Sequence, residues 1–213
     1  MGSALAAVQA PPARRERRKL EVRKRIVDAA IELFDARGFE ATKVSEICER
    51  ADVVNKTFFN HFPTKQHLLR EIAEAQIAIL FEDIRSVRSR AGNTRDRLLR
   101  FFERIADNIE AAGPMRRELV TEMILVTQAS SDGSLQSRRL QEAFSGLIRD
   151  GRLAGDVLEA HPLATQTEMV LGTFYALMFG WGHVESYPLR RRALAAARLL
   201  GDALCGPQHG KGS

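Results

Sequence analysis

Polar side chains that can hydrogen-bond to nucleic acid gather between residues 42 and 65. Asn55, Lys56 and Asn60 lie within a six-residue stretch. An amide group can pair with the edge of adenine, and a lysine ammonium can donate to O6 or N7 of guanine. The surrounding residues add hydroxyls, an imidazole and further ammonium groups, which can donate to phosphate oxygens. This combination predicts contacts to both the bases and the backbone of DNA.

The residue types that catalysis needs form no recognisable motif. The five histidines show neither the spacing of a helical metal site nor a nucleophile and base pattern. The glycines form neither a phosphate-binding loop nor a dinucleotide fingerprint. Two cysteines, Cys48 and Cys205, are too few for a disulfide framework. We therefore expect no enzymatic activity, no metal and no cofactor, and we expect a reducing, cytoplasmic location.

Positive charge is concentrated in the first third of the chain. Residues 1–70 contain 14 Lys and Arg against 9 Asp and Glu, whereas residues 71–213 contain 18 of each. A basic region beside a neutral one is what a phosphate-binding unit on a non-binding body requires. Residues 1–19 are interpreted as a flexible basic arm that follows the DNA backbone or enters the minor groove, with a solvated tail as the alternative. The expected contacts of this arm are Arg14, Arg15, Arg17 and Arg18.

Helical periodicity runs through the rest of the chain, and no stretch alternates as a strand does. Residues 20–65 are predicted to form three helices, the last two a helix-turn-helix, with Thr42 capping the second. A fourth helix is expected from Lys65 towards Arg90. Five more helices are expected at 94–112, 115–130, 134–150, 163–184 and 189–204, with a break at 131–133. The predicted fold is all-α with about nine helices: a head over 20–65, a body over 66–205 and a tail over 206–213.

A known family shows the same motif. Residues 37–42 read RGFEAT, residues 44–65 read VSEICERADVVNKTFFNHFPTK, and two leucines follow at 68 and 69. Together these closely resemble the DNA-binding domain of the TetR family. The resemblance implies a homodimeric regulator, expected to be a repressor, that binds palindromic double-stranded DNA and is released by a small molecule. The positions that bind the DNA backbone in the family match Thr42, Lys43, Thr57, His61 and Lys65, and Asn55, Lys56 and Asn60 are the expected base contacts.

Three positions depart from the family pattern. Asp52 replaces the usual Gly of the turn, which Asp can do because it tolerates a left-handed backbone better than most residues. Val54 replaces the usual Ser or Thr cap of the recognition helix, which leaves Asn55 as either the cap or a base contact. Phe59 replaces a Tyr whose hydroxyl meets a phosphate, so we expect that contact to be missing.

The helix expected at 163–184 has a smooth side where a second helix could approach closely. Gly172, Ala176 and Gly180 are four residues apart, and the last helix carries a stripe of Ala and Leu. In the family the final two helices pair with their copies in a dimer, and packing within one chain is the alternative. The longest apolar run, Met169 to Trp181, is shorter than a membrane helix, so no membrane contact is expected. The expected interface residues are Gly172, Ala176, Gly180, Leu189, Ala193, Ala196, Leu200 and Leu204.

The opposite side of the same helix carries bulky apolar residues, which fit either a ligand cavity or an ordinary core. Because the body has no excess of positive charge, the expected effector is apolar or amphipathic. An architectural DNA-binding dimer without an effector is the alternative function. The expected ligand-binding residues are Phe101, Phe102, Ile105, Met123, Val126, Gln128, Phe144, Phe174, Tyr175, Met178 and Trp181.

Overall fold

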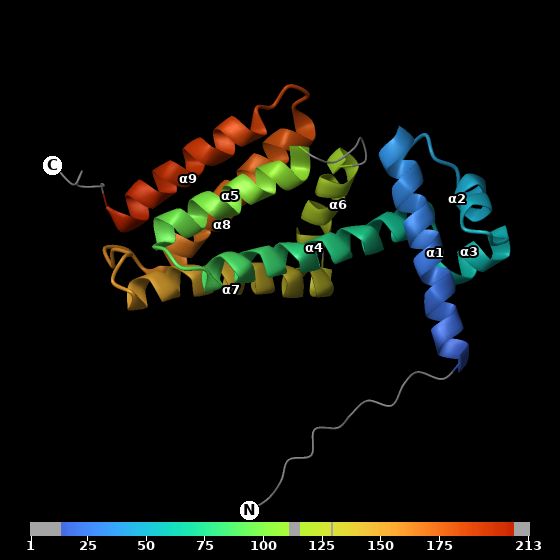
Figure 1. Cartoon of the computed structure of the whole chain (residues 1–213), viewed down its shortest axis with the longest axis horizontal. Helices are drawn as coiled ribbons and strands as arrows, with labels where there is room; N and C mark the ends of the chain where they lie inside the picture. The colour runs from blue at the N-terminus through green and yellow to red at the C-terminus, as the bar shows by residue number, and fades with distance from the viewer. Residues whose placement is uncertain (1–13, 111–115, 129, 207–213) are drawn as a thin grey trace, which may run out of the picture. The chain divides into compact units, whose positions relative to one another are not determined.

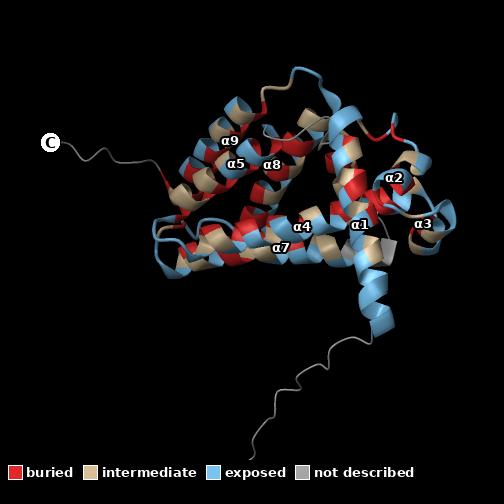
Figure 2. Ribbon diagram, turned by 45° about the vertical axis from the view of Figure 1, so that its right-hand side comes forward, coloured by how far each residue is buried: buried red, intermediate tan, exposed pale blue. Residues whose placement is uncertain are grey.

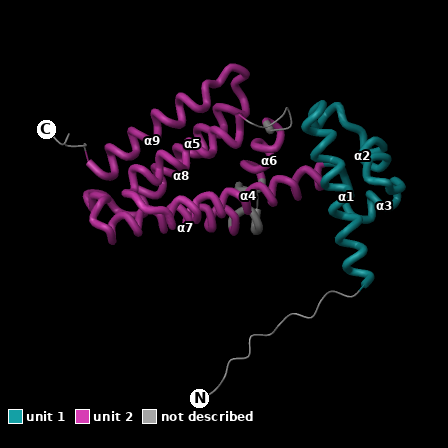
Figure 3. The backbone as a smooth tube through the Cα atoms, viewed as in Figure 1, with its two compact units in different colours: residues 1–65 teal, residues 66–213 magenta. Residues whose placement is uncertain are grey.

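A computed structural model describes residues 14–110, 116–128 and 130–206 as helices joined by turns, with no β-strand among them. The chain divides between Lys65 and Gln66 into two compact units, coloured separately in Figure 3. We call residues 14–65 the head and residues 66–206 the body. The all-α prediction is confirmed for these ranges, and the predicted arm before residue 14 and the tail after residue 206 lie outside them.

Three helices form the head. They are α1 (Arg14–Arg37), α2 (Val44–Arg50) and α3 (Asn55–His61), labelled in Figure 1. Apolar residues at helical spacing turn one side of each helix inward. Phe34 and Phe58 are fully buried, and the ring of Phe34 meets that of Phe39 edge to face at 5.2 Å between centroids. The core of the head is therefore built from one or two large side chains of each element.

α1 is longer than the sequence predicted. The expectation of a flexible arm is wrong for residues 14–19, because they form the first turns of α1, where every residue is exposed. Arg and Lys are good helix formers, and the negative charge of Glu16 in the first turn interacts favourably with the helix dipole. The helix ends at Arg37, and the next residue, Gly38, has a φ of 86° and donates its N–H to the carbonyl of Phe34 at 2.7 Å.

The body contains six helices among its described residues. They are α4 (Lys65–Ser89), which begins at the last residue of the head, α5 (Thr94–Glu110), α6 (Arg116–Gln128), α7 (Ser130–Leu153), α8 (Leu163–His183) and α9 (Leu189–Cys205). The break predicted at residues 131–133 is wrong, because these residues belong to the first turn of α7. Ser and Asp are tolerated at the start of a helix, and one Gly costs only about 1 kcal/mol there. None of the described helices is long and apolar enough to cross a bilayer.

Aromatic side chains from three helices form the centre of the body. Phe101 of α5 meets Phe144 of α7 edge to face at 5.2 Å, and Phe174 of α8 lies 6.1 Å from both rings. Figure 2 shows the buried residues of these helices turned towards one another. Helices distant in sequence are therefore held together at one point by ring contacts, each of which adds about 0.5–1.5 kcal/mol to area burial.

α9 packs along α5 and closes the core of its own chain. Leu189, Ala193, Leu200 and Leu204 are each at most 5% exposed. The prediction that these four residues form the dimer interface is therefore wrong, because their side chains already face the core of the same protomer. Ala196 is partly buried against that core. The outward side of α9 is marked instead by Leu199, which is 71% exposed.

Candidate DNA-binding helix and ligand cavity

The recognition helix α3 is anchored by one buried ring and exposes its polar side chains. Phe58 is fully buried, while Asn55, Lys56 and Asn60 are exposed. No ion pair involves Lys56 within the described part of the chain. A helix held on one side and free on the other can enter the major groove without losing internal contacts. The three predicted base contacts are thus placed where such contacts could form.

The structure decides between the two roles left open for Asn55. Val54 has extended backbone angles and occupies the cap position of α3 without a side-chain hydrogen bond. The N–H of Thr57 donates to the carbonyl of Val54 at 2.8 Å, so Asn55 is already inside the helix. Asn55 therefore does not cap α3, and its amide stays available to a base.

The turn between α2 and α3 depends on one left-handed residue. Asp52 has a φ of 52° and is the only non-glycine residue with positive φ in the described ranges. The N–H of the next residue, Val53, donates to the carbonyl of Cys48 at 2.9 Å, which closes the turn. Cys48, whose carbonyl accepts this hydrogen bond, is itself buried, and burial raises the pKa of its thiol. The expectation that Asp could replace Gly here is confirmed by the backbone.

Thr42 faces inward, so its predicted role is wrong in two ways. It does not cap α2, because the cap position belongs to Lys43. Its hydroxyl is not open to a phosphate, because the residue is 1% exposed and the hydroxyl donates to the carbonyl of Gly38 at 2.8 Å. The match to the family motif identified Thr42 as a residue that binds the DNA backbone. In the structure its hydroxyl instead satisfies the carbonyl of Gly38, in the loop after α1.

Lys65 holds the same loop from the other side. Its ammonium donates to the carbonyls of Phe39 at 2.7 Å and Thr42 at 3.0 Å, and it lies 4.2 Å from the centre of the Phe39 ring. These contacts use at least two of the three N–H donors of the ammonium within the head itself. The prediction that Lys65 binds DNA is therefore replaced by a structural role in which it fixes the start of α2.

Lys43 keeps the exposure that its predicted role requires. It occupies the cap position before α2, and its backbone N–H donates to the carboxylate of Glu46 at 2.7 Å. That hydrogen bond, helped by Arg37, lowers the pKa of Glu46. Thr57 is half-buried, and so is His61, whose carbonyl accepts from Arg23 at 3.0 Å. Sequence reasoning missed this tie between α1 and α3, in which Arg23 also lies 4.3 Å from the centre of the Phe62 ring.

The different roles assigned to Lys43 and Lys65 can be tested by measuring how the variants of each bind a DNA fragment selected by the purified protein. Lys65→Met should weaken binding to every sequence by destabilising the head, about 1.5–3 kcal/mol for hydrogen bonds to a charged group. It should leave the salt dependence unchanged, because no phosphate contact is lost. Lys43→Met is the control and should reduce the slope of log K against log salt by about 0.9. A reduced slope for Lys65→Met in binding assays from low to high salt would contradict the structural role.

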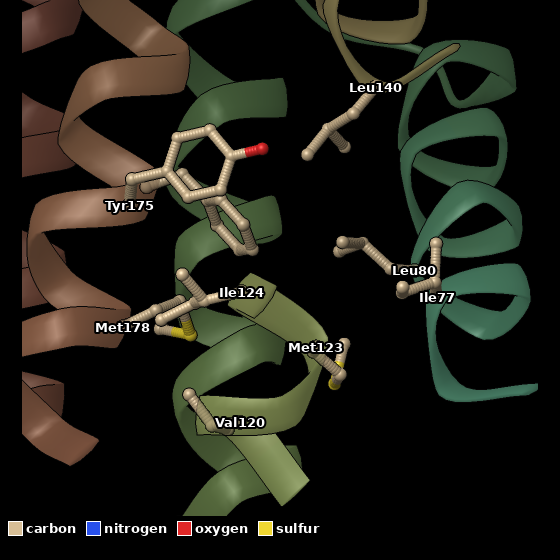
Figure 4. A pocket seen from close by; sticks show the side chains of 9 residues that line it. Ile77, Leu80, Val120, Met123, Ile124, Leu140, Tyr175 and Met178 are labelled. Carbon is tan, nitrogen blue, oxygen red and sulfur yellow. The ribbon is translucent and has the colours of Figure 1, made fainter. Parts of the chain in front are cut away.

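Four helices of the body line a small apolar cavity, shown in Figure 4. Its volume is about 30 Å³, and a neighbouring space of about 60 Å³ shares five of its lining residues. Met123 of α6 and Met178 of α8 line both spaces. Methionine side chains are flexible and adapt to irregular shapes, so the two spaces can widen together. The cavity as it stands is far smaller than the roughly 300–1,000 Å³ of a typical ligand site.

The structure places the predicted ligand-binding residues at different depths. Met123, Phe174, Tyr175 and Met178 line the cavity, and Ile105 lines the neighbouring space. Phe101, Phe102 and Phe144 are at most 1% exposed and belong to the aromatic core beneath it. Trp181 does not line either space; the guanidinium of Arg117 lies 5.2 Å from its ring centre. The side chains of Val126 and Gln128 lie outside the described residues.

Several lining residues were missed by sequence reasoning. α4 contributes Ile77 and Leu80, and α7 contributes Leu140. On α6, Val120 and Ile124 flank Met123 at helical spacing, which was a usable signal in the sequence. The contributions of α4 and α7 carried no such signal, because any buried helix shows the same periodicity.

The outer side of α8 is an exposed, partly apolar surface. Gly172 and Ala176 are exposed, and a side chain added at Gly172 would meet nothing within 4 Å. Met169 and Phe179, at the two ends of this stretch, are 60% and 57% exposed. Gly180 does not belong to this surface, because its Cα faces the ring of Tyr187 in the same chain; an added Cβ would lie 2.5 Å from that ring. The prediction is thus corrected at Gly180, and Gly172 and Ala176 remain candidates.

Comparison with known proteins agrees with this geometry. The family model of bacterial regulatory proteins, tetR family, matches residues 26–72. The HTH-type transcriptional repressor KstR of Mycolicibacterium smegmatis is 30% identical over 141 residues, which are 64% of this chain and 67% of that repressor. The chain belongs to the TetR family. It is therefore a transcriptional regulator with a DNA-binding helix-turn-helix, as the sequence predicted.

Solved structures support the TetR-family fold over most of the chain. The reduced form of Escherichia coli NemR matches with a TM-score of 0.65 at 18% identity, covering 88% of this chain and 99% of NemR. Thermus thermophilus FadR, solved in complex with lauroyl-CoA, matches with a TM-score of 0.63 at 21% identity, covering 90% and 99%. At such identities the likeness shows the fold alone.

One departure from the TetR-family pattern has a visible effect. Phe59 stands where the family has a tyrosine, and its ring is 52% exposed beside Phe58, at 5.3 Å between centroids. A phenyl ring at the surface of α3 can touch sugar or a thymine methyl, but it cannot donate a hydrogen bond to a phosphate. The hydrogen bond from the family's tyrosine hydroxyl to a phosphate therefore cannot form at this position.

Proposed function

We propose that the chain is a homodimeric repressor that binds a palindromic operator through α3 and is released by a small apolar or amphipathic ligand. The observation that carries the DNA-binding part is the exposure of Asn55, Lys56 and Asn60 on a helix fixed by buried Phe58. The exposed basic residues in the first turns of α1 add a sequence-independent contribution to affinity.

The ligand part of the proposal is supported by the cavity among α4, α6, α7 and α8. Its lining carries no charged side chain, so a charged group buried there would lack a partner, which costs several kcal/mol. The crystal structure of T. thermophilus FadR contains lauroyl-CoA, so a protein of this fold can hold an acyl compound. A ligand coupled to release must bind the form that does not hold DNA more tightly, and a 100-fold preference supplies about 2.7 kcal/mol.

An architectural DNA-binding dimer without an effector is the second candidate, favoured by the small volume of the cavity. A mobility-shift experiment separates the two functions. DNA selected by the purified protein is bound, and fractions of a metabolite extract are added. Release by an organic-soluble fraction supports the repressor with an effector, and binding that no fraction affects supports the architectural function.

Base reading by α3 makes a separate prediction. Lys56→Ala and Asn60→Ala should each change the selected DNA motif, with a loss of about 1–3 kcal/mol at the affected base pair for a bidentate contact. Glu49→Ala, at an exposed residue of α2, is a control that should leave the motif unchanged. Sequencing of DNA selected by each variant measures the effect. If both α3 variants select the wild-type motif, base reading by α3 is wrong.

A further inference from the structure

Tyr175 presents an unusual combination of burial and missing hydrogen bonds. Its hydroxyl oxygen exposes less than 1 Å² and has no hydrogen-bond partner among the described residues. Figure 4 shows this oxygen pointing from α8 into the space bordered by Leu140, Leu80 and Ile77. A buried hydroxyl without a partner costs about 1–3 kcal/mol, so native structures keep few of them.

Ordered water is a poor explanation for this hydroxyl. A buried water is held by two to four polar partners, and the other lining residues of the cavity offer only apolar or thioether groups; the polar residues Gln76, Asp83 and Asn108 line the neighbouring space and not this cavity. Packing alone is also a poor explanation, because phenylalanine would fill the same volume without the uncompensated oxygen. The remaining partner is a group that arrives with a ligand.

We infer that the effector is an apolar molecule with one uncharged oxygen, a ketone or a hydroxyl, that hydrogen-bonds to the Tyr175 hydroxyl inside this cavity. This inference rests on the ligand-responsive repressor proposed above and names the chemistry of its ligand. A carboxylate does not fit, because no cation lines the cavity to compensate its lost hydration. The bulk of the ligand contacts Met123, Met178 and the neighbouring aliphatic side chains.

The experiment compares 1-indanone with indane, two probes that share a ring skeleton and differ at one oxygen. Both are titrated into the full-length wild-type chain and into Tyr175→Phe, with methionine methyl groups labelled for NMR. Met123 and Met178 report the cavity, and Met169, which is 60% exposed on the outer side of α8, is the internal control. The quantity of interest is the ratio of the two dissociation constants in each protein, because this ratio removes differences in probe hydration.

In Tyr175→Phe, the dissociation constant of 1-indanone relative to that of indane should be about three- to tenfold higher than in the wild type. A net hydrogen bond of about 1 kcal/mol implies a change of this size. Indane should bind both proteins within about twofold, and the ligand-free variant should melt at or above the wild-type temperature. If indane binds and the ratio is the same in both proteins, the role of Tyr175 is overturned while the ligand cavity stands. If neither probe shifts the Met123 and Met178 signals of the wild type, the cavity assignment and the ligand part of the proposed function fall together.

Discussion

Truncation of Phe58 to alanine is expected to abolish specific DNA binding. Phe58 is the fully buried ring by which α3 is held in the head. Removing a buried phenyl group costs about 3–5 kcal/mol. At roughly 0.05–0.15 kcal/mol per residue, the head of some fifty residues has a total stability of about 3–8 kcal/mol. The loss is therefore comparable to the whole stability of this unit, and most molecules should lose the fold that positions Asn55, Lys56 and Asn60.

The adjacent ring supplies a matched control. Phe59 is 52% exposed, so Phe59→Ala should change head stability by less than about 1 kcal/mol. Hydrogen exchange followed by peptide mass spectrometry measures both variants in the full-length chain. Peptides from residues 14–65 should exchange rapidly in Phe58→Ala only, while peptides from α5 and α8 remain protected in both variants. Protected head peptides together with normal DNA binding in Phe58→Ala would contradict the assigned core.

The second large effect is expected at the outer side of α8. In the proposed homodimer Ala176→Glu places a carboxylate from each protomer in the interface, and an unpaired buried ion costs several kcal/mol. The dissociation constant of the dimer should rise at least a hundredfold, because each 1.4 kcal/mol is a factor of ten. Specific DNA binding should fall with it, since a monomer reaches only one half-site.

Ala154→Glu is the control for this substitution, because Ala154 is exposed in the turn after α7. Analytical ultracentrifugation at several concentrations measures the assembly, and circular dichroism checks that both variants stay folded. A dimer of unchanged stability in a folded Ala176→Glu chain would place the interface elsewhere.

Local pattern was sufficient to predict most of the helices, including the helix-turn-helix before residue 65. It failed at Thr42 and Lys65 because their partners are backbone carbonyls of the loop between α1 and α2, and the sequence does not show which way a side chain turns. A similar ambiguity misled the prediction for α9. An apolar stripe has the same spacing whether its own chain or a second protomer covers it, so only the position of α5 decided the matter.

The candidate cavity was predicted in part. The bulky side of α8 identified Phe174 and Met178, because a spacing of four residues places them on one side of a helix. The residues from α4 and α7 could not be predicted, because the meeting of helices distant in sequence is decided by packing of the whole body. The unpartnered oxygen of Tyr175 was equally invisible, since a missing hydrogen bond is a property of the surroundings.

The burial of Cys48 in α2 makes opening of the head measurable by chemical labelling of the thiol. The thiol is 4% exposed and its pKa is raised by burial, so a thiol reagent can attack it only when the head opens. The rate of labelling then reports how often the helix-turn-helix opens locally. Cys205, at the end of α9, is more accessible, and its labelling by the same reagent can be followed separately in the body. Two cysteines in one chain thus allow the lifetime of the DNA-binding fold to be followed without any engineered label.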